Sequence, residues 1–218
     1  MIRHGILLYL VTLAACSIAP QARDIAAYDF GPAAPAMAQP RIEINLNVAD
    51  ITAPSWMDNA NLYYRLAYSD AARPLAYANS RWVMPPAALL TQRLRASLRQ
   101  ASKAAVVSPS DGVSTEYVLR LELEEFSQVF DSAQNSRGIL RLHARLVRGR
   151  ELAAQQIFSI DLPAPSANAE GGVRALAAAS DEAGRRLSDW LVANLRREVF
   201  LTFNNILVKK SLIDIHFA

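Results

Sequence analysis

Alternation of apolar and polar residues over positions 117–162 constrains the fold more than any other feature of the chain. Every second residue is apolar in three successive segments, which is the pattern of strands with one buried and one open face. In the first segment the alternation shifts by one residue at Glu124-Glu125, which predicts a β-bulge. Short polar turns join the segments, so we expect an antiparallel meander. The alternating apolar residues are Tyr117, Leu119, Leu121, Leu123, Phe126 and Phe130, then Leu140, Leu142, Ala144 and Leu146, then Phe158, Ile160 and Leu162.

Two helices are expected outside this meander. Pro85-Pro86 opens the first, which runs to Ala101, because proline is tolerated in the first turn of a helix. Its leucines share one face, and its arginines are predicted to form a solvated face or, alternatively, to contact an acidic protein or anionic lipid headgroups. The second helix is expected to run to about Arg197. The leucines are Leu90, Leu94 and Leu98, and the arginines are Arg93, Arg95 and Arg99.

Shorter strands are predicted on the N-terminal side of the first helix and directly after it. They cover residues 42–48, 61–68, 75–82 and 105–107. Helices that each have one apolar face would pack on the same side of a single sheet. The sequence therefore predicts an α/β (α+β) fold, a two-layer sandwich of a largely antiparallel sheet with two helices on one face.

The N-terminus has the layout of a secretory signal. A basic start is followed by a short apolar run and by Leu13-Ala14-Ala15, directly before Cys16. The apolar run is too short to span a bilayer, which takes about 20 residues. Leu-Ala-Ala-Cys resembles a bacterial lipobox, which implies cleavage before Cys16 and acylation of that residue. An ordinary signal peptide with an incidental cysteine is the alternative. Ser17 follows the cysteine, where lipoprotein retention signals usually have an aspartate. By the same resemblance, this favours transfer to the outer membrane, with the protein facing the periplasm.

Four segments follow from these patterns. We expect a signal peptide over residues 1–15, a lipidated, Pro/Ala-rich tether over 16–40, a folded domain over 41–199 and an atypical tail over 200–218. The tail replaces the alanine and arginine of the body by asparagine, lysine and isoleucine. It is either a last strand or a reading frame that continues past its natural end. Because Cys16 is the only cysteine, no disulfide forms within the chain and a packed core must stabilise it.

Candidate catalytic groups are scarce. The single cysteine would carry lipid, and of the three histidines only His143 lies within the expected domain. These residues supply neither a metal site nor a nucleophilic triad, and no cofactor-binding glycine motif occurs. Glu122 and Glu124 could serve as a carboxylate pair, although both are expected on a solvated sheet face. A net charge of +3 does not call for a nucleic-acid partner. We therefore expect no enzyme, metal or cofactor.

Two aromatic segments are candidates for partner binding. Residues 77–82, Tyr-Ala-Asn-Ser-Arg-Trp, lead into the first helix, and Tyr77, Arg81 and Trp82 could form a partner-facing corner or, alternatively, core anchors. Within the expected tether, Tyr28 and Phe30 belong to the cluster Tyr-Asp-Phe-Gly-Pro. This cluster is either a local turn or a docking element.

Taken together, these motifs resemble the ABC-type transport auxiliary lipoproteins, the PqiC-like group. The resemblance rests on the lipobox, the Tyr28–Pro32 cluster, the 42–48 strand, Leu62-Tyr63-Tyr64-Arg65 and the 77–82 segment before its helix. It implies a non-enzymatic outer-membrane lipoprotein that docks the end of a periplasmic MCE-domain conduit and helps to pass lipid. Its partners would be that MCE-domain protein and inner-membrane ABC transporter components; a homo-oligomer is a further expectation. The alternatives are another envelope interaction lipoprotein, such as a secretion pilot or a regulator of cell-wall synthesis, and a lipid-anchored hydrolase.

Overall fold

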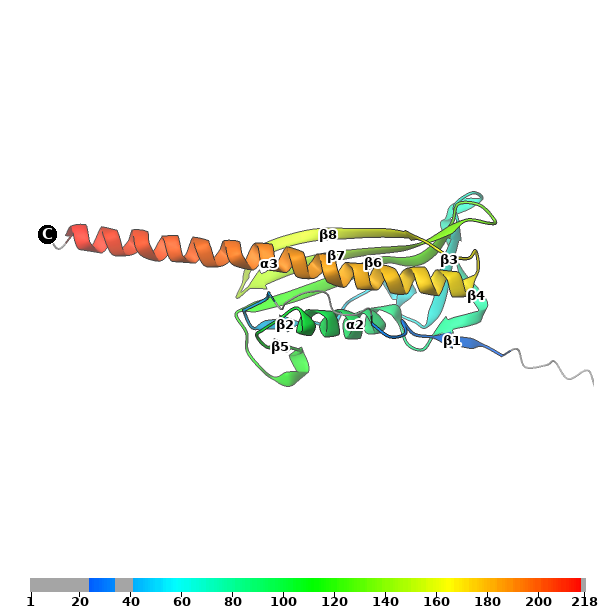
Figure 1. Cartoon of the computed structure of the whole chain (residues 1–218), viewed down its shortest axis with the longest axis horizontal. Coiled ribbons are helices and arrows are strands. Elements are labelled where there is room, and N and C mark those ends of the chain that lie inside the picture. Colours follow the sequence, from blue (N-terminus) through cyan, green and yellow to red (C-terminus); the bar gives the residue numbers. More distant parts are fainter. Residues whose placement is uncertain (1–23, 34–40, 217–218) are drawn as a thin grey trace, which may run out of the picture.

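The computed structural model describes residues 24–33 and 41–216, with side chains up to residue 197. One layer is an eight-stranded mixed sheet, and the other contains two helices (Figure 1). Two short 3-10 turns, η2 (Ser55–Met57) and η3 (Pro109–Asp111), lie in the connections. The strands are β1 (Ala26–Tyr28), β2 (Leu46–Val48), β3 (Asn61–Leu66), β4 (Asp70–Trp82), β5 (Val106–Val107), β6 (Tyr117–Phe130), β7 (Ser136–Arg148) and β8 (Glu151–Pro163); the helices are α2 (Pro86–Gln100) and α3 (Ala169–His216).

Strand β6 is the centre of the sheet. On one side it pairs with β7 along its whole length, and β7 pairs in turn with β8. On the other side β2 runs parallel to the first residues of β6, and β3 runs parallel to its last residues. Beyond β3 the order continues through β4 to β1, and beyond β2 it ends at β5. Neighbours of β6 therefore come from segments that lie far apart in the sequence.

The expected antiparallel meander is confirmed for β6, β7 and β8, including the bulge between Leu123 and Glu125. The expectation of a largely antiparallel sheet is only partly right. Four pairs are parallel, namely β1–β4, β2–β5, β2–β6 and β3–β6. Alternation predicts a strand and its buried face, but it contains no information on the direction of a neighbour that is distant in sequence.

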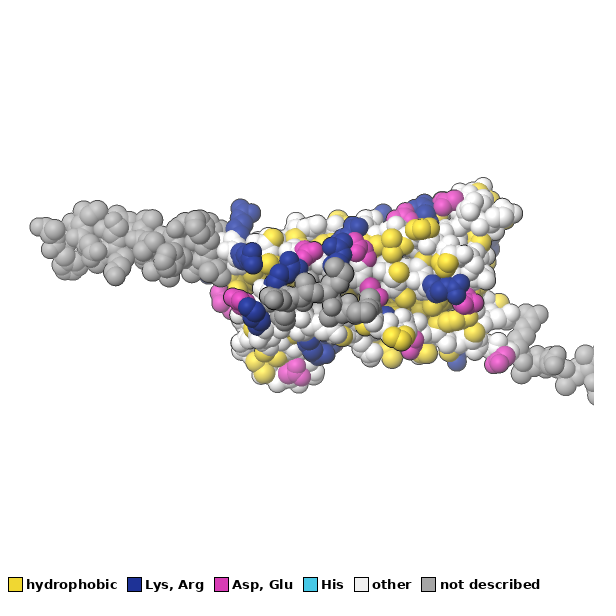
Figure 2. Space-filling model, in the orientation of Figure 1, with side chains coloured by type: hydrophobic (Ala, Val, Ile, Leu, Met, Phe, Trp, Pro, Cys, Tyr) yellow, Lys and Arg dark blue, Asp and Glu magenta, His cyan; other side chains and the backbone are white. Residues whose placement is uncertain are grey.

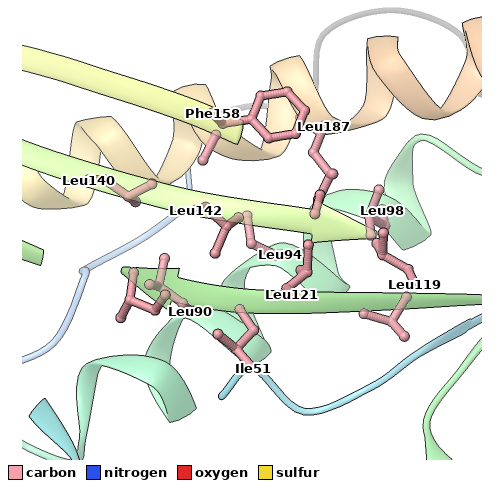
Figure 3. Packing of buried hydrophobic residues seen from close by; sticks show 14 of the residues in the cluster. Ile51, Leu90, Leu94, Leu98, Leu119, Leu121, Leu140, Leu142, Phe158 and Leu187 are labelled. Atoms are coloured by element: carbon pink, nitrogen blue, oxygen red, sulfur yellow. The ribbon is translucent and has the colours of Figure 1, made fainter. Parts of the chain in front are cut away.

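Both helices bury their predicted apolar faces against the sheet. Leu90, Leu94 and Leu98 of α2 are fully buried, and they meet Leu119 and Leu121 of β6 and Leu187 of α3 (Figure 3). Gly138 allows α3 to lie close to β7, because a Cβ at this position would be 2.9 Å from the Cβ of Ala175. The helix N-terminus of α2 also follows the prediction, with Pro86 at its first position.

Helix α3 is longer than expected. It continues from Ala169 to His216 and extends past the end of the sheet (Figure 1). The backbone of the tail up to residue 216 is therefore helical, and the alternative of a last strand is wrong. The boundary at residue 199 stays a prediction, and the signal peptide with Cys16 lies outside the described residues.

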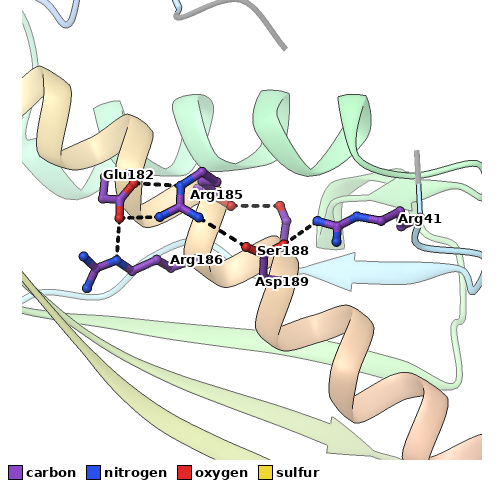
Figure 4. A network of polar contacts seen from close by, with 7 residues as sticks. Arg41, Glu182, Arg185, Arg186, Ser188 and Asp189 are labelled. Carbon is purple, nitrogen blue, oxygen red and sulfur yellow. Dashed lines mark hydrogen bonds and ion pairs between the residues drawn. The ribbon is translucent and has the colours of Figure 1, made fainter. Parts of the chain in front are cut away.

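The outer surface of α3 carries a network of charged side chains (Figure 4). Glu182 accepts hydrogen bonds from Arg185 and Arg186, and these bonds lower the pKa of the Glu182 carboxyl. Asp189 pairs with Arg185 and also with Arg41, at the start of the second described segment. The network thus attaches the chain entering β2 to the helix layer, although exposed pairs of this kind each contribute only a few tenths of a kcal/mol up to about 1 kcal/mol.

Candidate partner-docking site

The N-terminal segment joins the sheet as its edge strand beside β4. In the parallel register of β1 and β4, Ala26 lies opposite Ser80, Ala27 opposite Arg81, and Tyr28 opposite Trp82. The N–H of Val83 then donates to the carbonyl of Tyr28. Residues 24–33 belong to the expected tether, and the structure places them in the fold. We call the surface formed by β1 and residues 79–83 the β1–β4 corner.

A buried aromatic cluster lies beneath this corner. The ring centroids of Phe30 and Trp82 are 5.5 Å apart, and both rings contact Phe126 of β6 at 5.7 and 5.6 Å. Trp82 is 1% exposed and Phe30 is 8% exposed. In this structure neither side chain has surface to offer a partner, so we interpret them as core anchors of the corner. The N–H of Gly31 donates to Asp29 (2.7 Å), which forms the turn expected in this cluster.

Arg93 of α2 holds the N-terminal segment from the other side. Its guanidinium donates to the carbonyl of Phe30 (2.7 Å), lies over the Phe30 ring and pairs with Asp181 of α3 (3.1 Å). Arg95 similarly donates to the carbonyl of Val48 (2.6 Å) and to Asp50. The prediction of a solvated arginine face is therefore wrong for these two residues, because their long stems allow them to reach backbone carbonyls beside the helix.

Tyr77 has a different position from Arg81 and Trp82. Its ring packs on Tyr64 (4.6 Å between centroids), and its hydroxyl donates to Oε1 of Gln128 (2.8 Å). Burial raises the pKa of the Tyr77 hydroxyl, so this group stays a donor at neutral pH. The structure thus does not combine Tyr77, Arg81 and Trp82 into one surface.

Gln128 is a buried residue whose side chain hydrogen-bonds to three others, which was not predicted from the sequence. Its side chain is fully buried, and its amide donates to the hydroxyl of Ser136 (2.7 Å) and to the carbonyl of Asn168 (3.1 Å). With Tyr77 as donor to its oxygen, it connects β4, β6, β7 and the loop before α3. Gly172 leaves room for it, since a Cβ there would be 2.2 Å from Oε1. A glutamine at an inward position of a strand is the only sequence signal of such contacts.

The exposed part of the corner consists of Arg81 and two apolar neighbours. Side chains of successive strand residues point to opposite faces, so buried Trp82 requires that Arg81 points outward. Val83 is 52% exposed, and Ile25, two residues before Ala27 in β1, is 47% exposed. Tyr28 is half-buried against the core. Two exposed aliphatic side chains beside an arginine make a small surface of the composition found at protein interfaces.

Glu122 and His143 are chemical groups that the sequence singled out, and the structure places them opposite one another on β6 and β7. Among the side chains that the structure describes, in residues 24–33 and 41–197, no three His, Cys, Asp or Glu gather as a metal site. The carboxylate of Glu122 pairs with Arg145 (2.6 Å), and His143 lies half-buried on the open sheet face between Arg141 and Arg145. On the helix-bearing face, hydrophobic and charged side chains are interspersed (Figure 2).

Comparison with known proteins gives the family. Residues 28–188 match the model of the ABC-type transport auxiliary lipoprotein component, so the chain belongs to this family. The match begins at Tyr28, the last residue of β1, and it includes residues 79–83 of the β1–β4 corner. The family is one of auxiliary transport components, and none of the described helices is both long and apolar enough to cross a membrane.

Solved structures show the same fold. Protein XCC0632 from Xanthomonas campestris, assigned to the DUF330 family, superposes with a TM-score of 0.66 at 19% identity, covering 80% of this chain and 97% of that chain. An uncharacterized protein has a TM-score of 0.59 at 14% identity, covering 77% and 99% of the two chains. The comparison with curated proteins finds no match.

Proposed function

We propose that this protein is the outer-membrane lipoprotein of an ABC/MCE-type system that transports lipid across the envelope. It is anchored through acylated Cys16, faces the periplasm, and docks the end of the conduit formed by an MCE-domain protein. The observation that carries the proposal is the family match over residues 28–188. The lipobox-like sequence that ends at Cys16 supports it.

The β1–β4 corner is the surface that we assign to docking. Strand β1 begins ten residues after Cys16 in the sequence. The corner is therefore close in sequence to the proposed anchor. Arg81 supplies a cation, and Ile25 and Val83 supply exposed apolar area beside it. Such a combination binds a partner through a desolvated centre with an arginine at its edge.

Co-purification tests the proposal. The full chain, tagged at its C-terminus and extracted in detergent, should recover an MCE-domain protein and ABC transporter components, identified by mass spectrometry. Cys16→Ala should reduce this recovery because the protein leaves the membrane. Arg81→Glu should reduce it while the protein stays anchored.

Arg120→Glu is the matched control, since Arg120 is an exposed arginine on β6, away from the corner. It should leave recovery unchanged. Recovery of secretion or cell-wall synthesis proteins in place of MCE and ABC components would contradict the proposal and favour the other envelope lipoproteins.

A further inference from the structure

The ring of Phe30 fills a site that strands and helices of the core line, although Phe30 itself belongs to no strand or helix. It follows β1 by two residues. Its ring contacts Trp82 of β4 and Phe126 of β6, and the guanidinium of Arg93 on α2 lies 5.8 Å from its centroid. We call this place the Phe30 site. Its occupant therefore comes from an irregular segment, not from the elements that form it.

A single side chain holds this segment in the fold. Among residues 24–33, Phe30 is the only buried residue, and Asp29 and residues 31–33 on either side of it are exposed. Gly31 forms a turn with a φ of +63° directly after it. Release of residues 29–33 from the site therefore requires the withdrawal of one ring, and the pairing of β1 with β4 is not part of that change.

Arg93 contacts the oxygen atoms of the segment as well as its ring. Nη2 donates to the carbonyl of Phe30 (2.7 Å) and lies 3.4 Å from the carbonyl of Pro32, which it also contacts as a donor. Nε faces Asp181 of α3 (3.1 Å), so this carboxylate is on another edge of the guanidinium. Arg93 thus holds an aromatic residue by its ring and, through Nη2, by two nearby oxygens.

A C-terminal aromatic residue of another chain has the same groups in the same relation. Its ring would take the place of the Phe30 ring, and the two oxygens of its carboxylate would take the place of the two carbonyl oxygens. A hydrogen bond from a guanidinium to a carboxylate is roughly twice as strong as one to a neutral acceptor. Asp181 opposes a second anion, so the expected gain over a neutral terminus is modest, about fivefold in affinity.

The segment of the chain itself does not satisfy every donor of the site. The indole N–H of Trp82 is buried and has no acceptor among the described residues. A buried donor without a partner is destabilising. The site is therefore filled by Phe30 without being completed by it.

We propose that the Phe30 site binds the C-terminal aromatic residue of a partner chain, with the carboxylate on Arg93, and that Phe30 closes the site until the partner docks. This occupant rests on the proposed docking at the β1–β4 corner, because Trp82 lies between the corner residues Arg81 and Val83. Phe30 competes as part of the same chain, at a high effective concentration, so a partner gains access only when it is held at the corner.

The test uses a tripeptide that copies residues 28–30, Tyr-Asp-Phe, with a free carboxylate. It is titrated into the full chain in detergent, and the NMR signal of the Trp82 indole N–H, assigned with Trp82→Phe, reports binding. Phe30→Ala should bind the peptide at least about tenfold more tightly than the wild type does, because the competing ring is gone. The amidated peptide should bind Phe30→Ala about fivefold more weakly than the free acid. Arg93→Met added to Phe30→Ala should abolish that difference.

Phe158→Ala is the matched control. It removes a buried ring that packs on Trp190, at a distance from Arg93, and should give no gain in binding. Equal binding of acid and amide, no gain in Phe30→Ala, or the same gain in Phe158→Ala would each overturn the proposal. If Phe30→Ala does not fold, the acid and the amide are compared on the wild type at higher concentration, where the same fivefold difference is expected.

A lipid is the other occupant that an apolar site beside an arginine would suit. Displacement of the peptide by palmitate, with the same dependence on Arg93, would assign the site to a fatty acid and overturn the proposal. The titration contains no transport component, so its failure is distinguishable from a failure of the co-purification. Loss of the acid preference with MCE recovery intact would refute this site alone, and the reverse result would refute the transport partners alone.

Discussion

The two lateral edges of the sheet are built in opposite ways. At the β4 edge a three-residue strand closes the sheet, an aromatic cluster fixes it from beneath, and a proline and charges protect the remainder. At the β8 edge a 13-residue strand ends the sheet without a charged residue over positions 152–160. The first edge is therefore stabilised within the chain, whereas β8 pairs on one side only among the described residues. Variants at the two edges should differ in how much stability they lose.

The largest effect is expected for Trp82→Ala, at the closed edge. Removal of a fully buried indole leaves a cavity beneath β1, which should lower the free energy of unfolding by about 3–5 kcal/mol. Urea denaturation followed by fluorescence measures this change. Val83→Ala, at the exposed neighbour, should cost less than about 0.5 kcal/mol. Equal losses for both variants would contradict the burial of the cluster.

Arg93→Met tests whether the contacts of Arg93 with the N-terminal segment stabilise the β4 edge. The variant retains an apolar stem but leaves the Phe30 carbonyl and Asp181 without their partner, at a cost of about 1–3 kcal/mol. Proteolysis should then cut near residue 33 faster than in the wild type. Arg99→Met on the same helix is exposed, and unchanged stability is expected for it.

Gly138→Ala gives the corresponding test on the β8 side. The added methyl would lie 3.0 Å from backbone atoms of Ala175 and Leu176 in α3. The helix must therefore move away from β7. We expect a loss of about 1–3 kcal/mol in thermal or urea unfolding. Ser159→Ala, on the open face of β8, should have no such effect; a neutral Gly138→Ala would show that α3 is not held closely.

The smallest effect on stability is expected for Ile157→Lys. Its side chain is already more than half exposed, so the free energy of unfolding of the isolated chain should change by less than about 0.5 kcal/mol. Urea denaturation measures this change. A loss comparable to that of Trp82→Ala would mean that the β8 edge, like the β4 edge, is part of the core.

Local patterns predicted the elements well. Period-two alternation located β6 and its bulge, and the leucine spacing with Pro86 located α2, because burial of one face imposes these patterns directly. Strand β8 was expected only around residues 158–162, whereas it begins at Glu151. Its first half consists mainly of alanine and glutamine, which give no clear alternation.

Long-range pairing and side-chain reach could not be derived from the sequence in this way. The parallel contacts of β1, β2 and β3 join segments separated by loops and a helix. Arg93 was expected in solvent because polarity was taken as a guide to exposure, yet its charge is satisfied by a carbonyl and a carboxylate. For Trp82 and Arg81, strict alternation already requires opposite faces, so a shared partner surface was inconsistent with their own strand.

The parallel pairing of β1 with β4 has a mechanical consequence. Because β1 runs alongside β4 and is followed by buried Phe30, a pull on the N-terminus acts along the strand and loads the β1–β4 hydrogen bonds together rather than one after another. The buried Phe30, which contacts Arg93, then resists extraction of the N-terminal segment from the fold. A chain fixed to a membrane at its N-terminus while a partner moves against it would carry that load at the β1–β4 pairing.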